Sequence, residues 1–82
     1  MELEVVGFLK DGKYRIQILK ELNKTPLLPS EIAEKLGLHR SSVSRILNDM
    51  KKWDLIKSAS KNSRTIIYSI TKKGKKNLEE LK

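Results

Sequence analysis

Arg45 and Asn48 lie three residues apart and carry groups that can hydrogen-bond to the edges of nucleic-acid bases. The planar guanidinium group of Arg45 presents paired donors that match O6 and N7 of guanine. The amide group of Asn48 offers the donor and the acceptor that match N6 and N7 of adenine. Ser41, Ser42 and Ser44 precede them and can reach phosphates or bases without adding bulk. This stretch therefore has the side chains needed to bind a duplex.

A helix over residues 40–52 would place these groups on one face. Its apolar residues Val43, Ile46, Leu47 and Met50 follow the spacing i, i+3, i+4, i+7, which predicts one buried row on a helix. At 3.6 residues per turn, the opposite face is polar and basic. That face holds Ser41, Arg45, Asn48 and Lys52, with Ser42 and Ser44 beside them.

A second, shorter helix precedes this one. Ile32, Ala33 and Leu36 form its expected inner face, and Ser30 is placed to cap its start. Gly37 can end it, because glycine accepts the left-handed conformation that often follows a helix. Two short helices joined by a glycine turn form either a helix-turn-helix, whose second helix enters the DNA major groove, or an ordinary packing hairpin.

The rest of the chain predicts two helices before this pair and a hairpin and helix after it. The first ten residues form a short apolar helix that ends near "DG", and Asp11 is expected to cap a second helix that ends near Lys24. The β-branched stretches "LIKSAS" and "RTIIYSIT" flank the tetrad "KNSR" and predict a hairpin. Its Ile66, Tyr68 and Ile70 should point inward, and Thr71 should cap a final helix.

Charge favours a polyanionic partner. The 82 residues carry a net charge of +8, and Arg40 through Lys76 contains eleven bases against only Asp49 and Asp54. The chain has no cysteine, no apolar run long enough to span a membrane and no secretory signal at its acidic amino terminus. We therefore expect one domain over residues 1–82 in a soluble, cytoplasmic protein without membrane contact.

The helix-turn-helix pattern, followed by "LI", a basic hairpin and "SITKKG", resembles the winged-helix transcription regulators of the MarR and ArsR-like kind, particularly compact archaeal ones. The resemblance implies a mainly α fold of about five helices with a two- to three-stranded wing, and double-stranded DNA as the partner. It places groove-facing groups at Arg40, Ser41, Ser42, Ser44, Arg45 and Asn48. It assigns wing-tip contacts to Lys61, Asn62 and Arg64, and we add phosphate contacts from Lys52 and Ser30.

Apolar residues at the two ends of the chain could cover the monomer or join two copies. The relatives usually dimerise through terminal helices, so we expect a homodimer formed by residues of about 2–10 and 72–82. The expected contacts are Leu3, Val6, Leu9, Leu78 and Leu81. A small-molecule effector is not identified by any cluster of residues.

One other class of function competes with regulation. A winged helix can also serve as a protein- or RNA-interaction module within a larger assembly, since fold does not fix function. That interpretation predicts apolar or aromatic anchors on the exposed face of residues 41–52, where the sequence has Ser, Arg, Asn and Lys. We expect no enzyme activity, no catalytic residues, no cofactor and no metal site, because His39 is the only histidine and has no cysteine beside it.

Overall fold

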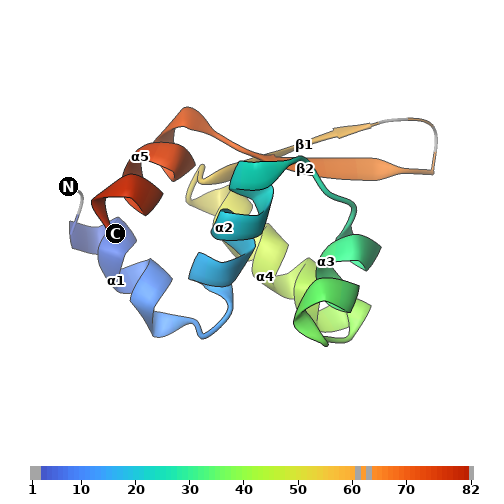
Figure 1. Ribbon diagram of the computed structural model, residues 1–82, viewed down its shortest axis with the longest axis horizontal. Coiled ribbons are helices and arrows are strands. Elements are labelled where there is room, and N and C mark those ends of the chain that lie inside the picture. The colour runs from blue at the N-terminus through green and yellow to red at the C-terminus, as the bar shows by residue number, and fades with distance from the viewer. Residues whose placement is uncertain (1–2, 61, 63, 82) are drawn as a thin grey trace.

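The computed structural model describes residues 3–60, 62 and 64–81 of the chain. The elements follow the order α1 (Leu3–Asp11), α2 (Arg15–Lys24), α3 (Pro29–Leu36), α4 (Arg40–Lys52), β1 (Ile56–Ser60), β2 (Ile66–Ile70) and α5 (Lys72–Glu80). This confirms the predicted order of helices and strands (Figure 1). No helix in the described ranges is both long and apolar enough to cross a membrane.

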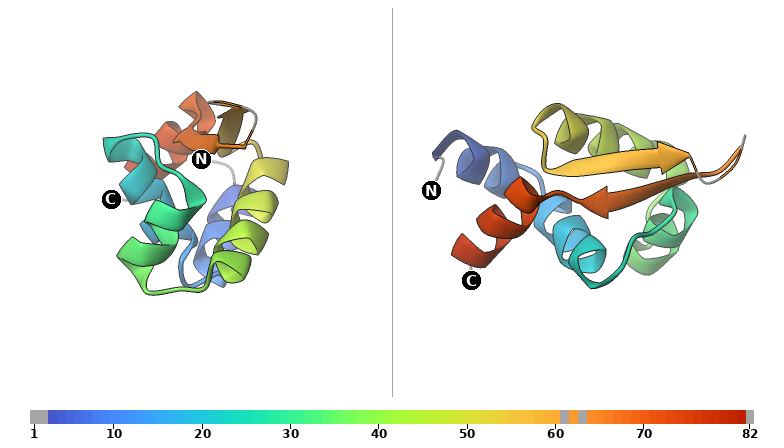
Figure 2. Two further views of the ribbon diagram at one scale, coloured as in Figure 1. Left: turned by 90° about the vertical axis from the view of Figure 1, so that its right-hand side faces the viewer. Right: turned by 90° about the horizontal axis from the view of Figure 1, so that it is seen from above.

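One apolar core joins all the helices to the base of the hairpin. α2, α3 and α4 supply its centre, with Ile18, Leu19, Ile32, Val43 and Leu47 each fully buried. Ile46 is only partly buried at the edge of the α4 row. α2 lies between the terminal helices and the α3–α4 pair, and the hairpin extends away from the body (Figures 1 and 2).

β1 and β2 pair antiparallel, with Ile56 opposite Ile70 at the base and Ser60 opposite Ile66 toward the tip. Tyr68 also exchanges two backbone hydrogen bonds with Leu27, at 2.9 and 2.8 Å, so a one-residue bridge adds to the two-stranded hairpin. Ile70 is buried, but Ile66 is 48% exposed, so its predicted inward orientation is wrong. Ile66 is the first residue of β2, at the end of the hairpin away from its base.

The predicted cap of α2 is wrong. Asp11 is the last residue of α1, and Tyr14 precedes the first residue of α2 without a side-chain capping hydrogen bond. The turn between these helices is held instead by a hydrogen bond from the Arg15 amide to the Gly12 carbonyl. α1 therefore ends at the "DG" signal, and α2 begins later than a cap at Asp11 implies.

The predicted cap of α3 is also wrong. The N-cap is Leu28, Pro29 is the first helical residue and Ser30 the second. Proline suits the first helical position, because it lacks an amide hydrogen that would be unpaired there and its φ is already helical. Glu31 takes over the capping role, since its carboxylate accepts a hydrogen bond from the Leu28 amide at 2.8 Å.

Two of the aromatic residues, Phe8 and Trp53, stack between helices. The rings of Phe8 in α1 and Trp53 after α4 are stacked, with centroids 4.8 Å apart. The guanidinium carbon of Arg15 lies 3.8 Å from the centroid of the Phe8 ring. This stack joins α1, α2 and the end of α4, and places the single tryptophan next to the last turn of that helix.

Thr71 caps α5 as predicted and ties it to the turn after α4. Its hydroxyl oxygen accepts a hydrogen bond from the Gly74 amide at 3.0 Å, and the hydroxyl donates to the Asp54 carbonyl at 2.7 Å. The Thr71 amide donates to the Leu55 carbonyl at 3.1 Å. These bonds fix the start of α5 against the segment that leaves α4.

Gly37 provides a test of the turn between α3 and α4. It has a φ of 66° and ends α3 in the left-handed conformation, and a Cβ there would meet no atom within 4 Å. We expect Gly37→Ala to lower the free energy of unfolding by about 1 kcal/mol through backbone strain alone. Gly7→Ala, in the open interior of α1, is the control and should raise it by about 0.5–1 kcal/mol. Urea denaturation measures both, and an unchanged midpoint for Gly37→Ala would contradict the assignment.

Candidate nucleic-acid interface

α4 turns its apolar side inward and its polar side to solvent. Val43, Leu47 and Met50 have no exposed surface, so the helix is fixed against the core along its length. The residues predicted to face a groove are all exposed, namely Arg40, Ser41, Ser42, Ser44, Arg45 and Asn48, together with Lys52. The structure thus brings the expected base-contacting and phosphate-contacting groups of this helix onto one free surface.

The amino-terminal end of α4 is suited to anions. His39 is its N-cap, has an extended backbone and makes no side-chain capping hydrogen bond. The first turn contains no acidic residue and begins with Arg40. The helix dipole and the side chain therefore both favour negative charge at this end.

The tip of the hairpin is organised by Asn62. Its side-chain oxygen accepts hydrogen bonds from the amides of Arg64, at 3.0 Å, and Thr65, at 2.9 Å. This is the side-chain-to-backbone pattern by which asparagine shapes a turn. The Asn62 oxygen thus shapes the turn, while the exposed Arg64 side chain supplies a positive charge at the tip. Lys61 lies outside the described residues.

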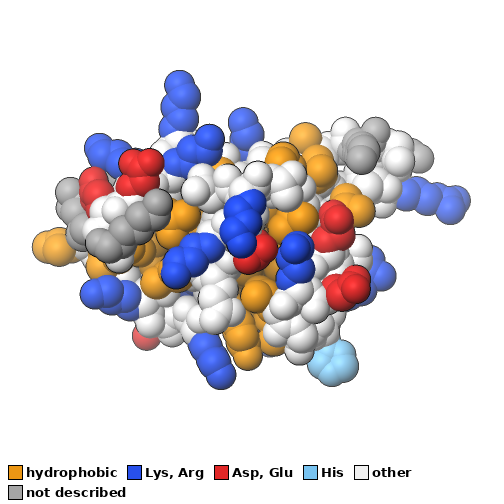
Figure 3. Space-filling model, viewed as in Figure 1, with side chains coloured by type: hydrophobic (Ala, Val, Ile, Leu, Met, Phe, Trp, Pro, Cys, Tyr) orange, Lys and Arg blue, Asp and Glu red, His pale blue; other side chains and the backbone are white. Residues whose placement is uncertain are grey.

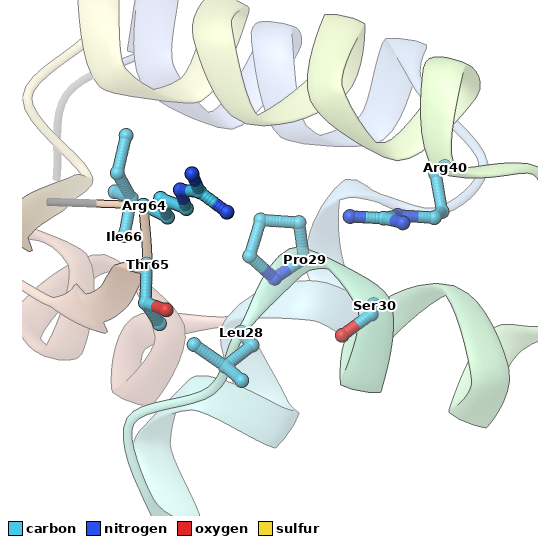
Figure 4. Close-up of a pocket in the computed structure, with 7 residues that line it drawn as sticks. All are labelled: Leu28, Pro29, Ser30, Arg40, Arg64, Thr65 and Ile66. Atoms are coloured by element: carbon cyan, nitrogen blue, oxygen red, sulfur yellow. The ribbon is translucent and has the colours of Figure 1, made fainter. Parts of the chain in front are cut away.

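A hollow of about 300 Å³ lies where the starts of α3 and α4 meet the hairpin. It is lined by Leu28, Pro29, Ser30, Arg40, Arg64, Thr65 and Ile66. Three of the predicted site residues, Ser30, Arg40 and Arg64, thus come from separate elements and border one space (Figure 4). Sequence reasoning named these residues but did not place them together.

Charge is distributed unevenly around this surface. In the view of Figure 3, Lys and Arg side chains spread over α2 and α5, and acidic side chains lie both near α3 and at the end formed by the terminal helices. Glu21 forms ion pairs with Lys24, at 3.4 Å, and with Lys35, at 3.8 Å. In the part of the chain that the structure describes, no acidic side chain pairs with Arg40, Arg45 or Arg64, so their charges are not neutralised within the protein.

Lys51 differs from the other basic residues of α4. Its ammonium nitrogen donates to the Ser58 hydroxyl at 2.9 Å and joins the end of α4 to β1.

Among residues 3–60, 62 and 64–81, no group of three or more His, Cys, Asp or Glu side chains could hold a metal ion.

Five helices, a glycine turn between α3 and α4 and a two-stranded hairpin define a winged helix-turn-helix of the MarR/ArsR-like kind, with α4 as its second helix and the hairpin as its wing. Within that class, the chain belongs to the HVO_A0261 N-terminal domain family, whose model matches residues 3–82. No curated protein matches the chain.

Solved structures agree with this class. ZitR from Lactococcus lactis, in complex with DNA, is similar with a TM-score of 0.72 and 28% identity over 79% of this chain and 46% of that one. YusO from Bacillus subtilis has a TM-score of 0.78 and 29% identity, over 84% of this chain and 51% of that one. The adhesin competence repressor AdcR from Streptococcus pyogenes has a TM-score of 0.80 over 85% of this chain and 53% of that one. Its sequence identity is only 18%, so this likeness shows the fold alone. The chain spans about half the length of these structures.

Proposed function

We propose that this protein is a sequence-specific regulator of transcription that binds double-stranded DNA as a dimer at a promoter. The observation that carries the proposal is the exposed face of α4, where Arg45 and Asn48 stand on a helix whose other side is fixed in the core. The protein acts in the cytoplasm by occupying a site on DNA and catalyses no reaction. The similarity to ZitR, which is seen in complex with DNA, supports this function.

In the proposed complex α4 lies in the major groove. Arg45 contacts guanine and Asn48 contacts adenine, while Ser41, Ser42 and Ser44 contact bases or adjacent phosphates. Basic groups around α4 and on the wing bind phosphates, which strengthens association with every duplex and orients the protein without reading sequence. The four lysines of α5 add to the charge that attracts DNA.

Selection of bound duplexes from a random pool tests this function. We expect one enriched consensus with two-fold symmetry, because two α4 helices related by a dimer axis read two inverted half-sites, about 34 Å apart. A pool that remains random after repeated rounds would contradict sequence-specific binding. A protein- or RNA-docking role has less support, because the exposed large apolar residues in the described ranges are Leu3 and Ile66, and neither is in α4.

The dimer is proposed to form through the terminal helices. α1 and α5 lie together at the end of the molecule opposite the wing tip (Figures 1 and 2). Leu3 is 83% exposed, and Val6 and Leu81 are partly exposed, so they can contact a second copy. Leu9 and Leu78 are buried within one chain, so they support this surface from behind and do not form part of it.

Leu3→Glu tests the proposed dimer. We expect the parent to be a dimer in light scattering at micromolar concentration and Leu3→Glu to be a monomer, because a carboxylate would be buried at the contact. Ile66→Glu is the matched control, since Ile66 is the other exposed large apolar residue of the described ranges and lies on the wing. A monomeric parent, or equal effects of the two variants, would exclude this interface.

A further inference from the structure

Two guanidinium groups converge on the hollow between α4 and the wing. Arg40 is the first residue of α4, and Arg64 is in the turn that leads into β2. Figure 4 shows their guanidinium groups directed toward each other above Pro29, while the Ser30 hydroxyl lies below Pro29, on the other side of the hollow. Two elements that are separate in sequence thus direct guanidinium groups toward one space.

The described residues around the hollow leave this positive charge without a partner. None of those that line it carries a carboxylate, and the adjacent Glu31 carboxylate is engaged by the Leu28 amide at 2.8 Å. Arginine cannot relieve the repulsion by losing its proton at any ordinary pH. Like charges that face each other are disfavoured unless an anion lies between them. The arrangement is therefore poised to accept an anion with several acceptor oxygens.

The size and lining of the hollow favour a phosphate group over an organic ligand. At about 300 Å³ it is at the lower limit for an organic ligand site, and such sites are mostly apolar and enclosed, roughly 300–1,000 Å³. Here the lining includes two cations and a hydroxyl, and it is formed by side chains at the surface. A phosphodiester offers two unesterified oxygens, which can each accept from a guanidinium group.

We propose that Arg40 and Arg64 clamp one phosphodiester group of the DNA backbone between them. This inference rests on the proposed function, and it assigns Arg40 to a phosphate and not to a base. The single negative charge of the bound phosphodiester lies between the two cations, offsets their repulsion and thereby fixes the wing relative to α4. Each arginine then binds the phosphate well only when the other arginine is present.

A double-mutant cycle on duplex DNA tests the clamp. Arg40→Ala and Arg64→Ala should each weaken binding about tenfold, the value expected for one charge-assisted hydrogen-bonded contact. The double variant should lose little more affinity than either single variant, because removing one arginine already disrupts most of the shared phosphate contact. The losses should be equal on the selected duplex and on a random duplex, since phosphate contacts do not read sequence.

Arg45 supplies the matched control, because it is an exposed arginine of α4 that does not line the hollow. The losses from Arg45→Ala and Arg64→Ala should multiply in the double variant, as for independent sites. If the losses from Arg40→Ala and Arg64→Ala also multiplied in their double variant, the two arginines would not share a phosphate. A change in sequence preference for Arg40→Ala would likewise contradict the clamp, and neither result would contradict DNA binding itself. Failure of the parent itself to bind any duplex would instead contradict the proposed function.

Discussion

Gly74→Ala is expected to lower the free energy of unfolding by about 3 kcal/mol or more, the upper range for overpacking a core. A Cβ on Gly74 would overlap the Leu55 carbonyl oxygen and would lie 2.8 Å from Cγ1 of Ile70. The Leu55 carbonyl cannot move freely, because it accepts a hydrogen bond from the Thr71 amide. The substitution must therefore separate α5 from the turn after α4.

The sign of this effect makes it diagnostic. Glycine inside a helix normally costs stability, so replacement by alanine usually adds about 0.5–1 kcal/mol. Gly7→Ala in α1 should show that gain, because a Cβ on Gly7 would meet no atom within 4 Å. Urea unfolding, followed by the fluorescence of Trp53, compares the two variants directly. If Gly74→Ala were as stable as the parent, the close packing of α5 on Leu55 would be wrong.

Arg45→Ala is expected to remove most of the discrimination between the selected duplex and a random one. A bidentate contact to guanine contributes about 1–3 kcal/mol of discrimination, and a dimer makes it in both half-sites. The side chain is exposed and makes no hydrogen bond or ion pair among the described residues, so folding should be unchanged. The measurement is the dissociation constant for each duplex at one salt concentration. The ratio of the constant for the random duplex to that for the selected duplex should fall in Arg45→Ala.

Lys52→Ala is the control for charge at the other end of α4. It removes one positive charge from the same exposed face but has no bidentate geometry to offer a base. We expect it to weaken binding to both duplexes by a similar factor. The slope of log affinity against log salt concentration should become shallower by about one, the value for one lost phosphate contact. If Arg45→Ala behaved in the same way, Arg45 would be a phosphate contact and not a base contact.

α4 could be predicted from the sequence because several local signals agree on it. The apolar spacing from Val43 to Met50 and the left-handed Gly37 gave both its buried face and the turn before it. The cap of α2 was mispredicted because Asp11 ends α1 and α2 begins only at Arg15. The cap of α3 was mispredicted because Glu31, and not Ser30, accepts the capping hydrogen bond. Pro29 set the start of α3 two residues earlier than a cap at Ser30 implied, and that signal was present in the sequence.

Contacts between distant segments could not be predicted in the same way. The apolar spacing at both termini could not show that Leu9 and Leu78 are buried by their own chain while Leu3 is exposed. Arg40 and Arg64 are far apart in sequence, and only the fold brings them to one hollow. The turn-shaping role of Asn62 did have a local signal, since asparagine commonly bonds to amides two and three residues later.

Titration of a labelled long DNA duplex in dilute salt, followed by fluorescence anisotropy, tests most directly whether the exposed face of α4 binds DNA. The parent should bind and lose affinity steeply as salt is added, because its lysines and arginines displace counterions from phosphates. A variant with Arg40, Arg45 and Lys52 all changed to Ala should remain folded and bind far more weakly. A parent that does not bind the duplex even in dilute salt, or a triple variant that binds as tightly as the parent, would contradict the account.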